Sequence, residues 1–259
     1  MDVILTAGGS PLPDEALYPA TRGGYKAMLE IAGKPMVGWV LNALAGAKSV
    51  NRIVVVGLPP ATDLGCNLPL TILPGNHTIL ANIRAAAEEL LAQDPNDRAV
   101  LILSADVPVI TPEMIDWLID QAEQSQQDFF YSAVDRSSLE QKYPGAQQPY
   151  SHFKNIDICS SDAMLVRSIK SVLTNPAWEK IIEARHDPLK LAELLGGNSI
   201  LFLLTRRYSI QETEKIIEKK LGISCRVILS PYPDLALSIN KPHQFDLAEA
   251  ELARRSRAA

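Results

Sequence analysis

Short, almost wholly apolar runs recur along this chain, and segments whose apolar residues have helical spacing alternate with them. In runs such as Val3–Ala7 and Ala99–Ser104 nearly every position is apolar, which is typical of strands covered on both faces. In Ile79–Leu91 the apolar residues instead repeat on one face of a helix. This alternation predicts an α/β fold: a doubly wound, mostly parallel sheet with helices on both faces.

Each element of this fold can be assigned to a residue range. The strands are predicted at Val3–Ala7, Arg52–Gly57, Ala99–Ser104, Asp128–Val134, Ile200–Thr205, Cys225–Leu229 and Ala236–Ile239. The helices are predicted to begin near Pro35, Thr78, Pro112, Ser161, Pro176, Pro188, Ile210 and Pro242. Proline is frequent at these starts because its missing N–H has no helical partner at the first position. The polar stretch Ser137–Ser151 is predicted to be a surface loop.

Charge and composition exclude several classes of partner. The formal net charge is -5, whereas binding to a phosphate backbone requires a basic surface, so we expect no nucleic-acid partner. The longest apolar runs have the length of a strand and predict no membrane span. The cysteines Cys66, Cys159 and Cys225 are widely separated and form no metal-binding pair. They are typical of a reducing compartment, and we expect a cytoplasmic protein.

The segment after the first strand is a candidate phosphate site, because ligands of open parallel sheets bind beyond the carboxyl ends of the strands. Ala7, Gly8 and Gly9 follow that strand, and glycines let backbone N–H groups approach phosphate oxygens. A plain turn is the alternative. The chain has neither the G-x-G-x-x-G pattern of dinucleotide-binding domains nor the Gly-Lys-Ser/Thr of a P-loop.

A second candidate site follows the strand at Ala99–Ser104, where Asp106 stands two residues before Pro108. Thr111 and Pro112 already supply the cap of the next helix, so Asp106 is not needed for capping. A carboxylate at a strand end is well placed to hold Mg²⁺, which prefers oxygen ligands and takes few of them from the protein.

Residues 25–36 add a lysine, Lys26, a Leu-Glu-Ile stretch and Gly33-Lys34-Pro35 before a helix. With the double glycine and the strand-Asp-x-Pro segment, this order resembles the nucleotidyltransferase family, which includes sugar-phosphate nucleotidyltransferases, cytidylyltransferases of isoprenoid synthesis and molybdenum cofactor guanylyltransferases. The chain departs from the family pattern in the loop between Ser10 and Tyr25, which is longer and lacks the compact Gly-x-Arg-Met segment. Arg22 is the candidate replacement for the arginine of that segment.

The resemblance implies a Rossmann-like nucleotide-diphospho-sugar transferase fold and a set of site residues. Lys26 and Arg22 would be catalytic, and Asp106 would hold Mg²⁺ together with Asn240, since some family members use asparagine as the second ligand. Gly75, Asn76 and Asn82 would contact the nucleotide. The alternatives without a functional role are that Lys26 is a solvated surface lysine and that Asn240 is a turn residue. Lys34 is expected to be an ordinary surface residue at the helix start.

The implied reaction moves a nucleoside monophosphate from an NTP to a phosphorylated acceptor (a sugar, polyol or cofactor phosphate) and releases pyrophosphate. We expect one domain over residues 1–259, with a nucleotide-binding half over about residues 1–136 and an acceptor-binding half over about residues 150–252. The sequence leaves the oligomeric state open, with a homodimer among the alternatives.

Two other functions stay open at this stage. A glycosyltransferase of the same fold would use a nucleotide-sugar, but it would usually carry Asp-x-Asp where this chain has Ser104-Ala105-Asp106. A non-catalytic nucleotide-binding relative is the second alternative, because the loop between Ser10 and Tyr25 is altered. No Ser/His/Asp spacing or His-Glu-x-x-His motif points to covalent or zinc chemistry.

Overall fold

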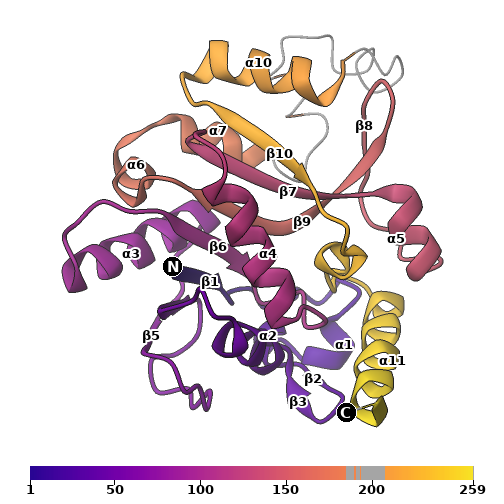
Figure 1. The fold of residues 1–259 in the computed structure, drawn as a ribbon. Helices are drawn as coiled ribbons and strands as arrows, with labels where there is room; N and C mark the ends of the chain where they lie inside the picture. Colours follow the sequence, from indigo (N-terminus) through magenta and orange to yellow (C-terminus); the bar gives the residue numbers. More distant parts are fainter. Residues whose placement is uncertain (185–189, 191–192, 194–207, 259) are drawn as a thin grey trace.

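The computed structural model describes residues 1–184, 190, 193 and 208–258, and one mixed sheet runs through its centre (Figure 1). The strands of this sheet are β1 (Asp2–Thr6), β4 (Arg52–Val56), β5 (Leu70–Leu73), β6 (Val100–Ser104), β7 (Phe129–Asp135), β8 (Ser151–His152), β9 (Asp157–Val166) and β10 (Cys225–Leu229). They lie in the order β10-β7-β9-β6-β1-β4-β5, with β8 added beside β9. All pairings are parallel except those of β9, which runs antiparallel to β6, β7 and β8. A separate small ribbon pairs β2 (Glu30–Ile31) with β3 (Lys34–Pro35).

Helices cover both faces of the sheet, as the alternation of the sequence predicts. Along β1, Val3 and Leu5 point into one core while Ile4 points into the other. The first core is closed by α2 (Met36–Gly46), α4 (Pro112–Glu123) and α11 (Pro242–Ala258). The second is closed by α3 (Ile79–Gln93), α6 (Ile169–Thr174) and α7 (Ala177–Ala184). The remaining elements are α1 (Tyr18–Thr21), α5 (Arg136–Lys142), α10 (Ile210–Leu221) and the 3-10 turns η1 (Lys26–Met28) and η2 (Pro233–Ala236). The predicted doubly wound, mostly parallel α/β class is therefore confirmed.

Most predicted elements form within a residue or two of their expected bounds, but three predictions were wrong. Residues 236–239 form no strand, because the chain turns through η2 there and Ile239 N–H makes a single bond to the carbonyl of Asp106 (2.9 Å). Ser161 begins no helix and lies within β9. The stretch Ser137–Ser151 is not all loop, because α5 occupies its first part, capped by the Asp135 side chain.

The Ser161 error has a clear physical reason. Ser160, Ser161 and Asp162 have the side chains of a helix start, but Ala163 pairs with β6, and Met164, Leu165 and Val166 pair with β6 on one side and β7 on the other. Pairing on both edges outweighs local preference. The strand β5 was not predicted. The strand predicted at Ile200–Thr205 and the helix predicted near Pro188 lie outside the described residues. Within the described ranges, no helix is both long and apolar enough to cross a bilayer.

Candidate functional site

A cavity of about 700 Å³ opens over the carboxyl ends of β1 and β6 and the middle of β9. Six of the residues predicted for the site line it: Gly8, Gly9, Lys26, Asn82, Asp106 and Asn240. The other four do not: Ala7 is buried, Gly75 and Asn76 lie outside the wall, and Arg22 is exposed. Residues far apart in sequence thus converge where a parallel sheet places its ligands.

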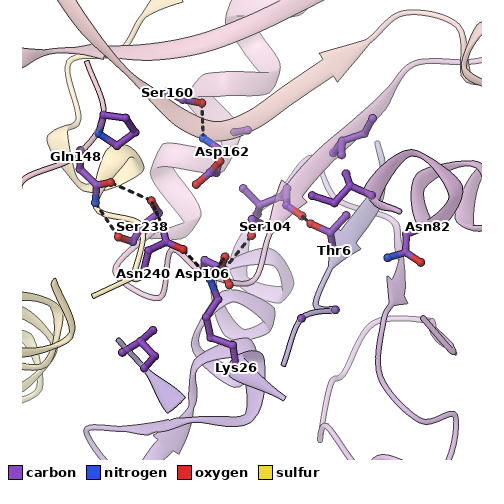
Figure 2. Close-up of a pocket in the computed structure, with 18 of the residues that line it drawn as sticks. Thr6, Lys26, Asn82, Ser104, Asp106, Gln148, Ser160, Asp162, Ser238 and Asn240 are labelled. Carbon is purple, nitrogen blue, oxygen red and sulfur yellow. Dashed lines mark hydrogen bonds and ion pairs between the residues drawn. The ribbon is translucent and has the colours of Figure 1, made fainter. Parts of the chain in front are cut away.

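Lys26 links the two predicted metal ligands. Its Nζ lies 2.7 Å from Oδ2 of Asp106 and 2.8 Å from Oδ1 of Asn240, as Figure 2 shows. The backbone N–H of Lys26 donates to the carbonyl of Gly9 (2.9 Å), so η1 is fastened to the glycine turn after β1. Asn240 reaches the same place because its neighbour Ile239 is hydrogen-bonded to the Asp106 backbone. A single cationic group is therefore already shared by a carboxylate and an amide oxygen.

Burial sets the electrostatics of Asp106. Removal from water raises the pKa of its carboxyl above the ordinary value, the Lys26 ammonium opposes that shift, and the nearby Asp162 carboxylate adds to it. A largely buried carboxylate near a second carboxylate gains from any further positive charge brought close to it. The pair of Asp106 and Asp162 thus favours a ligand that arrives with a cation.

The glycine turn depends on a close backbone contact that the sequence did not indicate. Gly57, directly after β4, has a φ of 114°, and a Cβ there would lie 2.2 Å from the Gly8 nitrogen. Only glycine therefore lets β4 pass so near the turn after β1. Gly75 in turn packs on Gly57: a Cβ added to Gly75 would lie 3.4 Å from the Gly57 Cα.

Asn82 connects this region to the cavity. Its buried side chain accepts the Asn76 backbone N–H through Oδ1 (2.6 Å), which orders the turn before α3. Asn76 is thus tied to the wall through Asn82, which itself lines the cavity and lies to the right of Thr6 and Ser104 in Figure 2. Thr78 caps α3 by accepting the N–H of Ala81 (3.1 Å).

Arg22 does not line the cavity. It ends α1 in the left-handed conformation, with a φ of 50° and its N–H donating to the Tyr18 carbonyl. Other residues of the long loop, among them Glu15 and Leu17, line the cavity instead. Lys34 is exposed on β3 and lies over the Trp39 ring, 4.7 Å from its centroid.

Three cavity residues or their supports were missed in the sequence. Asp162 lies in β9 with a φ of 50°, where the pairing of β7 and β9 shifts register, and its N–H donates to Ser160 Oγ (3.3 Å). Gln148 and Gln244 are buried beside Asn240. A polar residue in a non-glycine left-handed conformation is a frequent mark of a functional strand bulge, but it is not visible before the fold is known.

The donor set suits a hard cation that brings other ligands with it. Among the described residues, no group of three or more His, Cys, Asp or Glu side chains gathers as a metal centre. One carboxylate and one amide oxygen converge on the Lys26 ammonium, at 2.7 and 2.8 Å. Mg²⁺ commonly takes one or two protein oxygens and completes its shell with water and substrate phosphates. The residues present therefore fit Mg²⁺ bound together with a nucleotide.

Comparison with known proteins places the chain in a family. The model of the MobA-like NTP transferase domain matches residues 3–192, which include the glycine turn, Lys26 and Asp106 but not Asn240. Bifunctional protein GlmU from Rhodospirillum rubrum is 36% identical over 121 residues, which is 46% of this chain and only 25% of that protein.

Solved structures agree on the fold. A hypothetical transferase from Thermus thermophilus matches with a TM-score of 0.77 at 26% identity, over 94% of this chain and 98% of that one. A CMP:2-keto-3-deoxy-manno-octonic acid synthetase complexed with CTP matches with a TM-score of 0.59 over 98% of each chain. At 14% sequence identity this match supports a shared fold only. Since the family model spans most of the chain and the matched segments carry the strand-end site, the chain belongs to the MobA-like NTP transferases and is a nucleotidyltransferase.

Proposed function

We propose that the protein transfers a nucleoside monophosphate from an NTP to a phosphorylated small molecule, in a Mg²⁺-dependent reaction that releases pyrophosphate. The observation that carries this proposal is the convergence of Asp106, Asn240 and Lys26 at 2.7 and 2.8 Å, at the carboxyl ends of the central strands. Bound Mg²⁺ would neutralise charge on the triphosphate, and Asp106 and Asn240 are the residues that would hold it.

The other residues of the cavity suggest how substrates divide between its two ends. The glycine turn and Asn82 belong to the proposed nucleotide-binding half, and Ser160 and Asp162 belong to the proposed acceptor-binding half. In Figure 2 Asn82 lies to the right of Asp106, beyond Thr6 and Ser104, whereas Ser160 and Asp162 lie above it. Lys26 is the donor placed to stabilise charge that develops on the phosphates. Catalysis would then rest on positioning and on charge stabilisation.

A phosphorylated acceptor would make the reaction independent of a general base in the wall. Among the described residues that line the cavity there is no histidine; its carboxylates are Glu15, Asp106 and Asp162, of which Asp106 is engaged by Lys26. An acceptor phosphate is already ionised near neutral pH, so its oxygen can bond to the α-phosphorus while the bond to pyrophosphate breaks, without a general base. A hydroxyl acceptor would need one.

The test is a pyrophosphate-release assay of ATP, GTP, CTP and UTP against a panel of sugar, polyol and cofactor phosphates with Mg²⁺. We expect at least one pair to release pyrophosphate in step with a new nucleoside-diphosphate product. Turnover of nucleotide-sugars without pyrophosphate would instead identify a glycosyltransferase. Binding of Mg²⁺ and an NTP without any turnover would identify a non-catalytic relative.

A pair of variants tests the metal ligands. Asp106→Asn removes the only carboxylate of the pair, and we expect turnover to fall by about 10²–10³-fold with the fold intact. Asn240→Asp keeps the size and adds an oxygen ligand, so we expect a change of less than about tenfold. Calorimetric titration with Mg²⁺ should show weak binding to the empty protein and tighter binding with NTP, since each ligand favours the other. Full activity of Asp106→Asn would show that the metal lies elsewhere.

A further inference from the structure

Two buried glutamines flank the loop that carries Asn240. Gln148, in the segment before β8, is 5% exposed, and Gln244, in the first turn of α11, is 1% exposed. Burying an amide costs free energy unless its N–H and C=O groups are hydrogen-bonded. The hydrogen bonds of these two side chains therefore identify the groups that they hold in place. Both glutamines form hydrogen bonds with the loop Ser238–Lys241: Gln148 with Ser238 and Gln244 with Asn240.

Gln244 holds the backbone of the loop. Its Oε1 accepts the N–H of Asn240 (2.8 Å) and the N–H of Lys241 (2.9 Å), and its Nε2 donates to the carbonyl of Ala146 (2.9 Å). All three partners are backbone groups with fixed donor or acceptor roles. The orientation of this amide is therefore determined, and it ties the loop to the chain just before Gln148.

Gln148 determines the direction of the remaining bonds. Its Nε2 must donate to the Ser238 carbonyl (2.7 Å), so its Oε1 faces the Ser238 hydroxyl at 3.3 Å and can only accept. The hydroxyl hydrogen is committed to that bond, so Ser238 Oγ accepts from Nδ2 of Asn240 (3.3 Å). With Nδ2 engaged there, Oδ1 faces Lys26 Nζ, as Figure 2 shows.

We infer that Gln148 and Ser238 are positioning residues that fix the Asn240 amide with its oxygen toward the metal position. This deepens the proposed function and rests on it, because it explains how a neutral amide serves as a metal ligand. An asparagine can turn over and present N–H groups, which repel a cation, whereas an aspartate offers oxygen at either end. A chain that uses Asn240 therefore needs groups that prevent the flip. The Lys26 ammonium, which can only donate, favours the same orientation, and the relay from Gln148 through Ser238 holds the amide from its other end.

The experiment measures metal affinity in single and double variants. The probe is Mn²⁺, titrated with whichever of ATP, GTP, CTP and UTP binds wild type most tightly. We expect Ser238→Ala and Gln148→Met to weaken Mn²⁺ binding by about 10-fold or more, as removal of groups that orient a ligand commonly does. Ser230→Ala is the matched control, since Ser230 is also buried but its Oγ accepts only the N–H of Tyr232 (3.0 Å) among the described contacts.

The decisive arm adds Asn240→Asp. In that background either end of residue 240 presents oxygen, so Ser238→Ala should change Mn²⁺ affinity by less than about twofold. A merely structural role of Ser238 would give the same loss in both backgrounds and would overturn the inference. Unfolding midpoints of all variants identify any that fail to fold.

A nucleotide-free measurement separates this inference from the proposed function. The side-chain NH₂ signals of Asn240, assigned by their loss in Asn240→Asp, should show slowed exchange with water in wild type and faster exchange in Ser238→Ala. Unchanged exchange would refute the relay even if the enzyme is active. If no NTP supports Mn²⁺ binding, the proposed function fails, and the exchange data still decide how the amide is held.

Discussion

At the scale of single residues, Lys26 and Lys34 show how position separates two similar side chains. Both lie in the segment whose pattern resembles the nucleotidyltransferases, eight residues apart. Lys26 is largely buried between Asp106 and Asn240, whereas Lys34 is exposed over Trp39. The attraction between a cation and a largely buried carboxylate is stronger than that between charges surrounded by water, because the effective dielectric constant is lower.

We expect Lys26→Ala to lower kcat/KM by about 10²–10³-fold, equivalent to about 2.7–4 kcal/mol of barrier, because a charge-stabilising donor is lost. Lys34→Ala should change it by less than about twofold, as exposed substitutions usually do. Pyrophosphate release measures both. Equal rates for the two variants would remove Lys26 from the site. In the same assay, a loss in Arg22→Ala similar to that in Lys26→Ala would show that the long loop brings Arg22 to the nucleotide.

At the scale of elements, the turn after β1 is shaped by its neighbour β4. Gly8 lies against Gly57, and the two backbones approach closer than any side chain permits. The first turn therefore depends on a glycine more than forty residues away. This dependence follows from the parallel pairing of β1 and β4, which brings their carboxyl ends together.

We expect Gly57→Ala to destabilise the protein by about 2–4 kcal/mol and to weaken NTP binding, since its Cβ would overlap Gly8 and its φ of 114° is strained for alanine. Gly38→Ala is the matched control, because Gly38 lies in α2 and its Cβ would have only Pro35 Cδ nearby, at 3.9 Å. Alanine there should be neutral or stabilise by up to about 1 kcal/mol. Denaturant unfolding and NTP titration give both values. Equal stability of the two variants would refute the close-contact argument.

The same scale shows what the sequence could and could not provide. Strands with continuous apolar runs, such as β1 and β6, were predicted because burial on both faces leaves a strong local pattern. The strand β9 was missed because its middle is polar where it crosses the cavity, and its pairing partners lie far away in sequence. Glycine and lysine positions at the site followed from the family pattern. Gln148 contacts Ser238, 90 residues away, and Gln244 contacts Ala146, 98 residues away, so the local sequence holds no signal for these contacts.

At the scale of the whole molecule, a cluster of charges fastens α11 to the rest of the chain. The buried Asp234 accepts from Lys142 Nζ (2.6 Å) and Tyr143 Oη (2.8 Å), and Arg255 contacts it as well. Glu251, on the same helix as Arg255, bonds to that guanidinium at 2.8 Å. The cluster joins α5, η2 and α11 around the segment that leads to Asn240.

Hydrogen bonds from Arg254 and Arg255 lower the pKa of Glu251 from 4.5 to about 2. A carboxyl whose pKa is lower in the folded than in the unfolded state stabilises the fold when the pH is above the unfolded-state pKa. That contribution is lost as the pH falls through the folded-state pKa. We therefore expect the free energy of unfolding to fall between about pH 5 and pH 2, and to fall less steeply in Glu251→Gln. That variant should also lose about 1–3 kcal/mol at pH 7.

Glu249→Gln is the control for this prediction, because Glu249 is exposed on the same helix. It should follow the pH dependence of wild type. Unfolding curves by circular dichroism across this range provide the test. An unchanged slope in Glu251→Gln would show that other carboxyls govern the acid sensitivity.

The antiparallel strand β9 also bears on how the chain folds as it leaves the ribosome. It lies between β6 and β7, so within the sheet β7 is hydrogen-bonded to β9 and β10 and is linked to the parallel strands of the first half through β9. Until residue 166 has been synthesised, β6 therefore keeps an unpaired apolar edge, and such edges readily pair with other chains. A fragment ending at residue 136 would hold the glycine turn, Lys26 and Asp106 yet expose that edge. We therefore expect the nascent chain to be most prone to aggregation just before β9 emerges and covers the edge of β6.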